Sequence, residues 1–308
     1  MSIGTNTEPA GYRLTLKRKM QGWTRLEDGT IVPPAQSHLV QLPASVAKLH
    51  VVHQESDTEI STRIAERFDV LVMLTTACIV GAARSLIISG PPGLGKSYTV
   101  ENMFQEIDPT EINHTIVRGN IRATGLYKLL YDHREKGQVL IFDDADAIFY
   151  DEISLGLLKA VCDTTDRRQV CWRTEGSMIS EKTAEVIPKK FDFEGTIIFI
   201  SNINFDERIE KNDKLAPHLA ALISRSHFID LGMRSRRDYF VRIKQVLTSG
   251  LLSSKGYDEF AEKEIVDFIE QNISKLRELS LRTALKIAAL YSSKNDWRKI
   301  AKITTCKN

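Results

Sequence analysis

The stretch SLIISGPPGLGKS, residues 85–97, decides how this chain folds, because it joins an apolar strand-like run to a glycine-rich turn. The pattern G-x-x-x-x-G-K-S/T is satisfied by Gly90, Gly95, Lys96 and Ser97. Glycines let the backbone turn its N–H groups around a polyphosphate, and the helix expected at residues 98–106 adds its positive end. The sequence therefore predicts a phosphate-binding loop between a strand and a helix.

The chemistry of this loop points to ATP with Mg²⁺. A lysine at the position of Lys96 reaches the outer phosphates, and the hydroxyl of Ser97 is placed to ligate the metal. The expected nucleotide-binding residues are Gly90, Pro91, Pro92, Gly93, Leu94, Gly95, Lys96, Ser97 and Tyr98.

Composition sets broad limits on the class of protein. The chain has 308 residues, 42% of them hydrophobic, and a formal net charge of +2, which neither demands nor excludes nucleic acid. Its four cysteines lack the spacing of a disulfide framework or a metal site. The longest uncharged apolar stretch, residues 70–83, is too short to span a bilayer and is expected to form a buried helix. With no secretory signal visible at the N-terminus, we expect a soluble cytoplasmic protein without a membrane partner.

The pattern along the chain predicts three parts: an N-terminal accessory region at 1–57, an α/β core at 58–232 and a helical lid at 233–308. In the core, apolar strand-like runs alternate with amphipathic helices, which favours a three-layer fold with a parallel sheet covered on both faces. The expected strands after the loop are residues 115–117, 139–142, 196–200 and 228–231. In the N-terminal region, a basic cluster lies beside Trp23 and is either a nucleic-acid contact or a solvated arm: Arg13, Lys17, Arg18, Lys19 and Arg25.

A second motif follows the phosphate-binding loop in the sequence. Residues 139–144 read VLIFDD, so a buried strand ends in two carboxylates 47 residues after Lys96. Carboxylates at the C-terminal edge of a parallel sheet lie where ligands bind. Asp143 is expected to hold Mg²⁺ through water, and Asp144 to polarise the attacking water.

With these motifs the chain resembles the AAA+ ATPase family from about residue 57 to the end. The resemblance makes Asn202, which ends the next core strand, a water-positioning sensor. It makes Arg225, just before the last core strand, an arginine that acts in a neighbouring subunit's ATP site, with Arg208 as runner-up. It also makes Arg282, two residues after the expected helix cap Ser280, a second sensor in the lid. The resemblance therefore implies ATP hydrolysis between the subunits of a homo-oligomer, most often a hexameric ring.

The chain departs from the family pattern in two places. The second carboxylate, Asp144, is usually a glutamate, so water is held differently or Asp146 assists. Residues 168–174 and 185–191 are expected to form a hairpin that resembles the insertion before the first sensor in ring helicases and MoxR-type chaperones. The cations available on it for a nucleic-acid backbone are Arg167, Arg168, Arg173, Lys182, Lys189 and Lys190; a solvated surface excursion is the alternative.

Three functional classes remain open at this stage. The first is a DNA-dependent motor or loader, since the single-module layout also resembles ATPases of tailed bacteriophages, which act in the host cytoplasm. The second is a MoxR-like chaperone that remodels a client or adaptor protein. The third is an assembly module switched by nucleotide binding with slow or no hydrolysis, an alternative that the Asp144 departure keeps open.

Overall fold

The computed structural model describes residues 24–25, 31–32, 55–173, 176–293 and 296–307, and the chain divides into two units, 1–54 and 55–308. In the first unit, β1 (Thr24–Arg25) pairs antiparallel with β2 (Ile31–Val32). The basic cluster beside Trp23 falls outside the residues whose side chains the structure describes.

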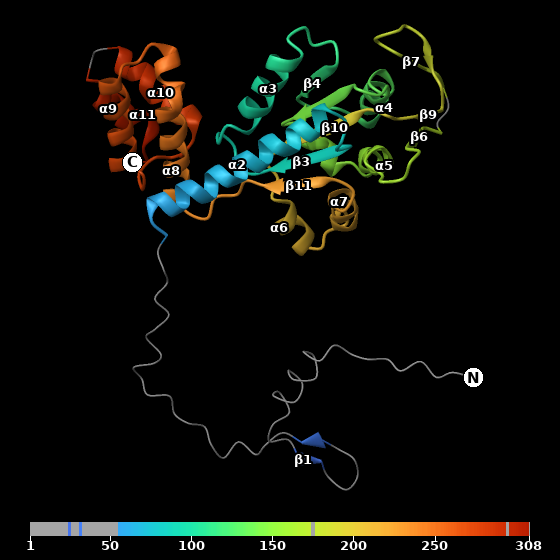
Figure 1. Ribbon diagram of the computed structural model, residues 1–308, viewed down its shortest axis with the longest axis horizontal. Helices are drawn as coiled ribbons and strands as arrows, with labels where there is room; N and C mark the ends of the chain where they lie inside the picture. The colour runs from blue at the N-terminus through green and yellow to red at the C-terminus, as the bar shows by residue number, and fades with distance from the viewer. Residues whose placement is uncertain (1–23, 26–30, 33–54, 174–175, 294–295, 308) are drawn as a thin grey trace. The chain divides into compact units, whose positions relative to one another are not determined.

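The second unit is built on a five-stranded parallel sheet with the order β11-β3-β10-β5-β4 (Figure 1). Each strand coincides with an apolar run that the sequence predicts as a strand. Their bounds are β3 (Ser85–Ser89), β4 (His114–Arg118), β5 (Val139–Asp143), β10 (Thr196–Ser201) and β11 (His227–Asp230). Because all the strands are parallel, their carboxyl ends meet at one edge.

Helices cover both faces of the sheet, which confirms the predicted three-layer α/β fold. One face carries α2 (Asp57–Ile79) and α3 (Lys96–Ile107). The other carries α4 (Ala123–Asp132), α5 (Glu152–Val161), α6 (Phe205–Glu210) and α7 (Ala216–Ile223). The alternation of strand side chains explains the two layers, since Leu86 and Ile88 enter one core while Ile87 enters the other.

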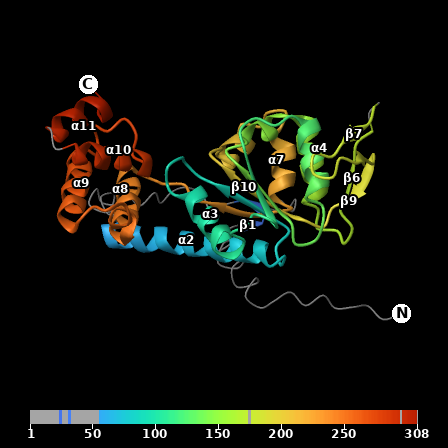
Figure 2. The same ribbon diagram turned by 90° about the horizontal axis from the view of Figure 1, so that it is seen from above.

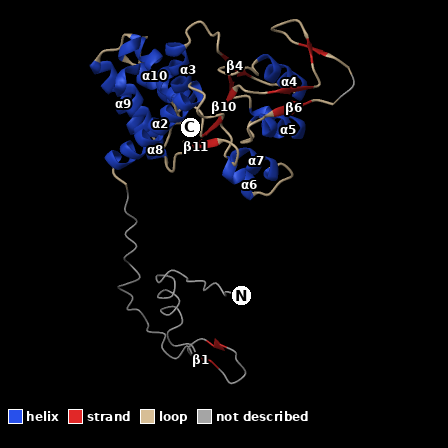
Figure 3. Ribbon diagram, turned by 45° about the vertical axis from the view of Figure 1, so that its right-hand side comes forward, coloured by secondary structure: helices blue, strands red, loops and turns tan. Residues whose placement is uncertain are grey.

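The chain after Gly232 is helical and forms the predicted small all-α part, which lies to one side of the sheet in Figure 3. It contains α8 (Arg236–Val246), a π-helical turn (Leu247–Leu251), a 3₁₀ turn (Ser253–Lys255), α9 (Glu259–Gln271), α10 (Leu281–Ser292) and α11 (Trp297–Thr305). The expected helix starts are confirmed: the Ser235 hydroxyl accepts from the N–H of Asp238, and that of Ser280 from the N–H of Thr283. We call this part the lid.

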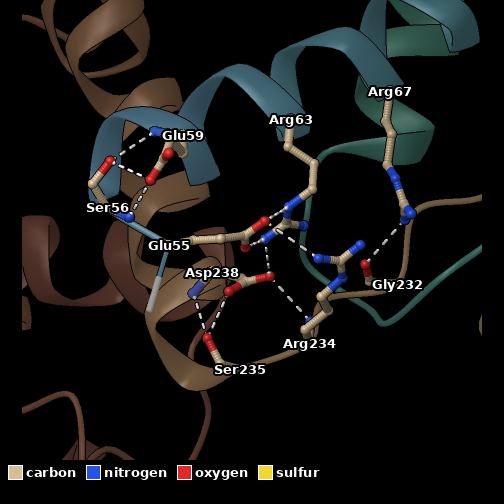
Figure 4. Close-up of polar contacts among 9 residues, drawn as sticks. All are labelled: Glu55, Ser56, Glu59, Arg63, Arg67, Gly232, Arg234, Ser235 and Asp238. Atoms are coloured by element: carbon tan, nitrogen blue, oxygen red, sulfur yellow. Dashed lines mark hydrogen bonds and ion pairs between the residues drawn. The ribbon is translucent and has the colours of Figure 1, made fainter. Parts of the chain in front are cut away.

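Helix α2 connects the lid to the core. Figure 2 shows it running beneath both, with α8 beside its first turns. Arg63 donates to Glu55 and Asp238 at 2.7 and 2.9 Å (Figure 4). One turn later, Arg67 donates to the carbonyls of Asp230 and Gly232 at the point where the chain leaves β11.

The prediction of a buried helix at residues 70–83 is wrong in part. Helix α2 ends at Ile79, and only one of its faces is buried, through residues such as Leu71 and Cys78. Val70 and Met73 on the opposite face are 44% and 69% exposed, because α2 covers the sheet from outside rather than passing through a core. None of the helices that the structure describes combines the length and apolar character required to cross a bilayer.

The predicted hairpin is present between α5 and β10. Strand β6 (Gln169–Cys171) pairs antiparallel with β9 (Lys190–Asp192), and β7 (Met178–Ile179) pairs with β8 (Val186–Ile187) nearer the tip.

The expectation that all six cations of the hairpin are available is wrong for Arg168, which is buried and donates to the carbonyls of Val161 and Gly195. Arg167 is exposed but forms an ion pair with Asp192. The remaining cations are exposed: Arg173, Lys182, Lys189 and Lys190.

Candidate functional site

The glycine-rich loop joins β3 to α3 at the carboxyl edge of the sheet. Gly93 and Gly95 have φ of 75° and 96°, in the left-handed region that glycine enters without strain. Between them the Leu94 side chain is fully buried, so it anchors the loop while the backbone turns above it. The segment therefore forms the predicted turn into a helix N-terminus, the usual place for a phosphate.

Lys96 lies in the centre of this turn and is only 5% exposed. Its ammonium group donates to the carbonyls of Gly90 and Pro91 at 2.5 and 2.9 Å and to Oδ1 of Asn202 at 2.9 Å. Burial lowers the pKa of Lys96 to about 8, although nearby carboxylates oppose the shift. A phosphate would supply the close negative charge that this buried cation lacks.

Ser97 and Asp143, the two residues expected to hold Mg²⁺, are in direct contact. The Ser97 hydroxyl donates to Oδ1 of Asp143 at 2.6 Å, which places two oxygen ligands together. The other oxygen, Oδ2, accepts from Nε of Arg118 at 3.0 Å. Arg118 ends the neighbouring strand β4 directly beside Asp143 and also pairs with Glu101 of α3 at 2.5 Å. Arg118 thus holds the Asp143 carboxylate from the side away from Ser97.

Asp144 and Asn202 form the second pair beyond the strand ends. Asn202 donates from Nδ2 to Oδ1 of Asp144 at 2.7 Å, and the same side chain accepts from Lys96 through its own Oδ1. Asp144 has a φ of 53°, an uncommon backbone conformation for a residue other than glycine. Its N–H donates to the carbonyl of Ile200, which fixes this turn against β10.

Asp146 lies close to this pair but is held differently. Its carboxylate accepts from the Ser201 hydroxyl at 2.6 Å. Burial raises the pKa of Asp146 above the ordinary aspartate value, even though the Ser201 hydrogen bond opposes the shift. Asp146 is therefore part of the local network around the two predicted carboxylates.

The lid closes one side of a cavity of about 240 Å³ above the loop. Arg282 lines it from the first turn of α10, together with Lys96 and Asp144. The remaining lining residues are Pro92, Gly93, Gly95, Ser97, Tyr98, Asn202, Val246, Leu251, Leu281 and Leu285. The cavity therefore has a polar end at the loop and an apolar end against the lid, which suits a nucleotide.

Direct contact joins the loop to the lid. The N–H of Leu281 donates to the carbonyl of Gly93 at 2.8 Å. A Cβ on Gly93 would lie 2.4 Å from Cβ of Ser280, so only glycine permits this approach. From α8, Arg242 donates to the carbonyl of Leu94 at 3.3 Å and stacks over the ring of Phe68.

Arg225 lies apart from this group. It follows α7 and precedes β11, at the edge of the sheet opposite the loop, and Nη1 donates to the carbonyl of Ala221. Within one chain it does not meet Lys96. The runner-up, Arg208 in α6, is paired with Asp213 at 2.9 Å.

The residues present fit ATP with Mg²⁺. The loop offers backbone N–H groups and a buried cation, while Ser97 and Asp143 offer the oxygen ligands that Mg²⁺ prefers. The described residues hold no cluster of three or more His, Cys, Asp or Glu side chains suited to a metal. Mg²⁺ is usually held by one or two carboxylates together with phosphates, so the single hydroxyl–carboxylate pair is sufficient.

The structure thus brings together Lys96, Ser97, Asp143, Asp144, Asn202 and Arg282, and leaves Arg225 at the opposite edge of the sheet. Sequence reasoning missed two residues that contact this site. Arg118 could have been found, because it ends a strand at the same edge. Arg242 had no local signal, since its position depends on how the lid packs on the core.

A known protein is similar to this chain in sequence. The chain is 39% identical over 251 residues to the uncharacterised 36.7 kDa protein in the nrdC-mobD intergenic region of Enterobacteria phage T4, a match that covers 80% of this chain and 76% of that protein. No family model matches the chain.

Two solved structures share a distant likeness in fold. The Holliday junction branch migration motor RuvB of Thermotoga maritima matches with a TM-score of 0.43 and 15% identity, covering 78% of this chain and 68% of RuvB. NtrX of Brucella abortus in complex with ADP matches with a TM-score of 0.41 and 13% identity, covering 79% and 50%. These scores are too low to bear on the function of this chain.

Proposed function

The chain belongs to the same family as the 36.7 kDa protein of Enterobacteria phage T4, and for this family we propose an ATPase of the AAA+ type. One observation carries the proposal: Lys96, Asn202 and Asp144 form a continuous hydrogen-bonded chain at the phosphate loop. Ser97 and Asp143 lie beside it, and Arg282 lines the same cavity. The phage relative also fits a protein that works in a host cytoplasm.

Each residue has a separate task in this proposal. The backbone of residues 90–97 and Lys96 bind the phosphates, and Arg282 brings a second cation from the lid. Ser97 and Asp143 hold Mg²⁺, which neutralises phosphate charge when bound. Asp144 accepts a hydrogen bond from the attacking water and orients it, while Asn202 fixes the Asp144 carboxylate.

The position of Arg225 makes an oligomer part of the proposal. Because it lies at the opposite edge of the sheet from Lys96, it can complete only the site of another copy. A cation supplied in this way stabilises charge that develops on the transferred phosphoryl group, an effect of roughly 10³ to 10⁵ in rate. The proposal therefore includes a homo-oligomer, with a hexameric ring as its expected form.

The hairpin supports a role linked to nucleic acid. Its four exposed cations without an ion pair in the described part of the chain suit a phosphate backbone: Arg173, Lys182, Lys189 and Lys190. One observation favours the alternative, a MoxR-like protein-remodelling role. Ile179 and Val186 lie opposite each other near the tip and are 55% and 64% exposed, as a grip on an apolar client requires.

The test is steady-state ATP hydrolysis by the purified chain, with and without single- and double-stranded DNA at modest salt. It tests both the ATPase activity and the link to nucleic acid. Lys96→Ala should lower turnover at least about a hundredfold, because it removes the cation at the phosphates. Lys299→Ala, at an exposed lysine of α11, is the matched control. Stimulation by DNA supports a motor or loader, and DNA-independent turnover supports the chaperone. Nucleotide binding without turnover would instead support the assembly switch.

A further inference from the structure

A second hollow, of about 370 Å³, lies at the opposite edge of the sheet, where β3 and β11 begin. Its walls include two arginines, Arg84 and Arg225. Hydroxyl groups of Thr164, Ser224 and Ser226 line it as well, together with the carboxylate of Asp163. The hollow is polar and carries more positive than negative charge.

Neither arginine has a carboxylate partner among the described residues. Arg84 donates from Nη1 to the carbonyl of Thr165 at 2.6 Å, and Arg225 donates from Nη1 to that of Ala221 at 2.8 Å. Both are half-buried, and within the described ranges neither forms an ion pair with a carboxylate. An Asp163 oxygen already accepts from the N–H of Thr164. Two guanidinium groups with free donors in one hollow suit an anion with several oxygens.

The two arginines are held at neighbouring positions. The Ser85 hydroxyl, next to Arg84 in the chain, is 3.3 Å from the carbonyl of Arg225 and 3.0 Å from the Ser226 hydroxyl. The starts of β3 and β11 are thereby tied together, so the two side chains face the same space from adjacent strands.

A nucleotide at this chain's own phosphate loop would lie out of reach of the hollow. Strand β3 runs from Ser85 at the hollow to Ser89 before the phosphate loop, which at about 3.3 Å per residue is roughly 13 Å. An anion bound by Arg84 and Arg225 must therefore belong to another molecule.

We propose that Arg84 acts together with Arg225 to bind the terminal phosphate of a nucleotide held by a second copy of this chain. The inference rests on the proposed ATPase function and adds a second cation to the trans site. A terminal phosphate carries a charge of about −1.5 to −2, which two guanidinium groups match. A nucleic-acid strand presents a row of phosphates, whereas here a single pair of arginines lies beside the Asp163 carboxylate.

The test is a mixed-subunit experiment with Arg84→Gln. Alone, this variant should bind ADP as the unaltered protein does, because its own phosphate loop is intact. It should turn over ATP at least about tenfold more slowly, because no copy supplies Arg84 to its neighbour's site. Lys96→Ala subunits cannot use ATP but retain both arginines. Mixing the two variants should restore turnover above either alone, since a Lys96→Ala copy supplies Arg84 to the site of its neighbour.

Two further variants separate charge from structure. Arg84→Lys should recover part of the turnover because it keeps the positive charge. Lys136→Gln removes one charge from an exposed lysine at the same edge, outside the hollow, and should change nothing.

Several results would overturn the proposal. Normal turnover by Arg84→Gln would do so, as would a loss that mixing with Lys96→Ala does not restore. If Arg84→Gln weakens DNA binding while turnover without DNA is unchanged, the hollow belongs to a nucleic-acid surface instead. If the unaltered protein neither binds nor hydrolyses ATP, the ATPase function fails together with the inference. Loss of turnover with Lys96→Ala but not with Arg84→Gln removes the inference alone.

Discussion

Arg63 and Asp238 are 175 positions apart in the chain, yet the guanidinium of the first donates to the carboxylate of the second at 2.9 Å. Their side chains are only 16% and 3% exposed, so the pair is nearly dry. The contact ties helix α2 to the first lid helix and fixes the lid over the cavity that Arg282 lines. The pair therefore both stabilises the fold and positions the lid.

Replacing Asp238 by Asn should therefore destabilise the protein by about 2 kcal/mol at pH 7, because it removes the more buried of the two carboxylates with which Arg63 pairs, while Glu55 remains. Urea unfolding measures the change. Arg234→Gln is the control: Arg234 belongs to the same network but is 62% exposed, and its loss should cost less than about 1 kcal/mol. Equal effects of the two variants would contradict the assignment.

The same pair predicts a dependence of stability on pH. Burial alone would raise the pKa of Asp238, but the Ser235 hydroxyl and the Arg63 guanidinium outweigh it and hold the pKa below the usual value. A carboxylate with a lowered folded-state pKa stabilises the fold above about pH 3.9, and this is lost as the pH falls through the folded-state pKa. The difference in unfolding free energy between Asp238→Asn and the unaltered protein should shrink below pH 4.

Gly93→Ala should separate the lid from the phosphate loop. The new Cβ would lie 2.4 Å from Cβ of Ser280, so α10 must move and the Leu281–Gly93 hydrogen bond breaks. ADP affinity, measured by titration, should fall at least about tenfold because the cavity opens. Gly81→Ala is a close control, since Gly81 has the same φ of 75° and nothing within 4 Å of the added atom. A similar loss of affinity in both variants would point to backbone strain alone.

Binding of ADP should be linked to protonation of Lys96. Burial lowers the pKa of Lys96 to about 8, and a bound phosphate raises it again. Binding then takes up a proton near pH 8, and affinity falls by up to about tenfold per pH unit above it. Calorimetry in buffers of different ionisation enthalpy counts this proton. The absence of uptake between pH 7 and 9 would show that Lys96 is already fully charged.

Arg118 should set the concentration of Mg²⁺ that the site requires. Its guanidinium occupies one oxygen of Asp143, next to the Ser97 contact, so Arg118→Gln removes a competing cation. The midpoint of the Mg²⁺ dependence of ADP binding should move to several-fold lower concentration. Arg122→Gln is the control, because Arg122 is an exposed arginine four residues further along. An unchanged midpoint would leave Arg118 with a purely structural role.

Asp144→Asn distinguishes the two candidate carboxylates near the water. Turnover should fall by about a hundredfold with little change in ADP affinity, because the phosphate contacts remain. Asp146→Asn is the comparison, since Asp146 is held by Ser201 rather than by Asn202. If Asp146→Asn abolishes turnover and Asp144→Asn does not, the water is polarised by Asp146.

Local pattern predicted the core of this fold well. Each strand of the sheet is a short apolar run, and the glycine-rich turn needs only its own residues to form. Asp143 was predicted at the carboxyl edge of a parallel sheet, and the family resemblance placed Asn202 at the end of the next core strand; β5 and β10 are neighbours in the sheet. Apolar content without periodicity misled the assignment of residues 70–83, where Met73 is exposed.

The remaining features depend on packing between distant segments. Charge alone made Arg168 look available, but its guanidinium satisfies the Val161 and Gly195 carbonyls at the base of the hairpin. The Arg63–Asp238 pair and the position of Arg242 follow from how α2 and α8 meet. The local sequence pattern of either helix alone does not predict this packing.

Helix α2 has 23 residues and is therefore about 35 Å long. It is clasped to the lid near its start and packs on the sheet further along, so one continuous helix spans both parts. A helix rarely kinks without a proline or a glycine, and α2 contains neither between Asp57 and Ile79. The lid and the sheet therefore share one rigid backbone element in addition to the chain connection that follows β11.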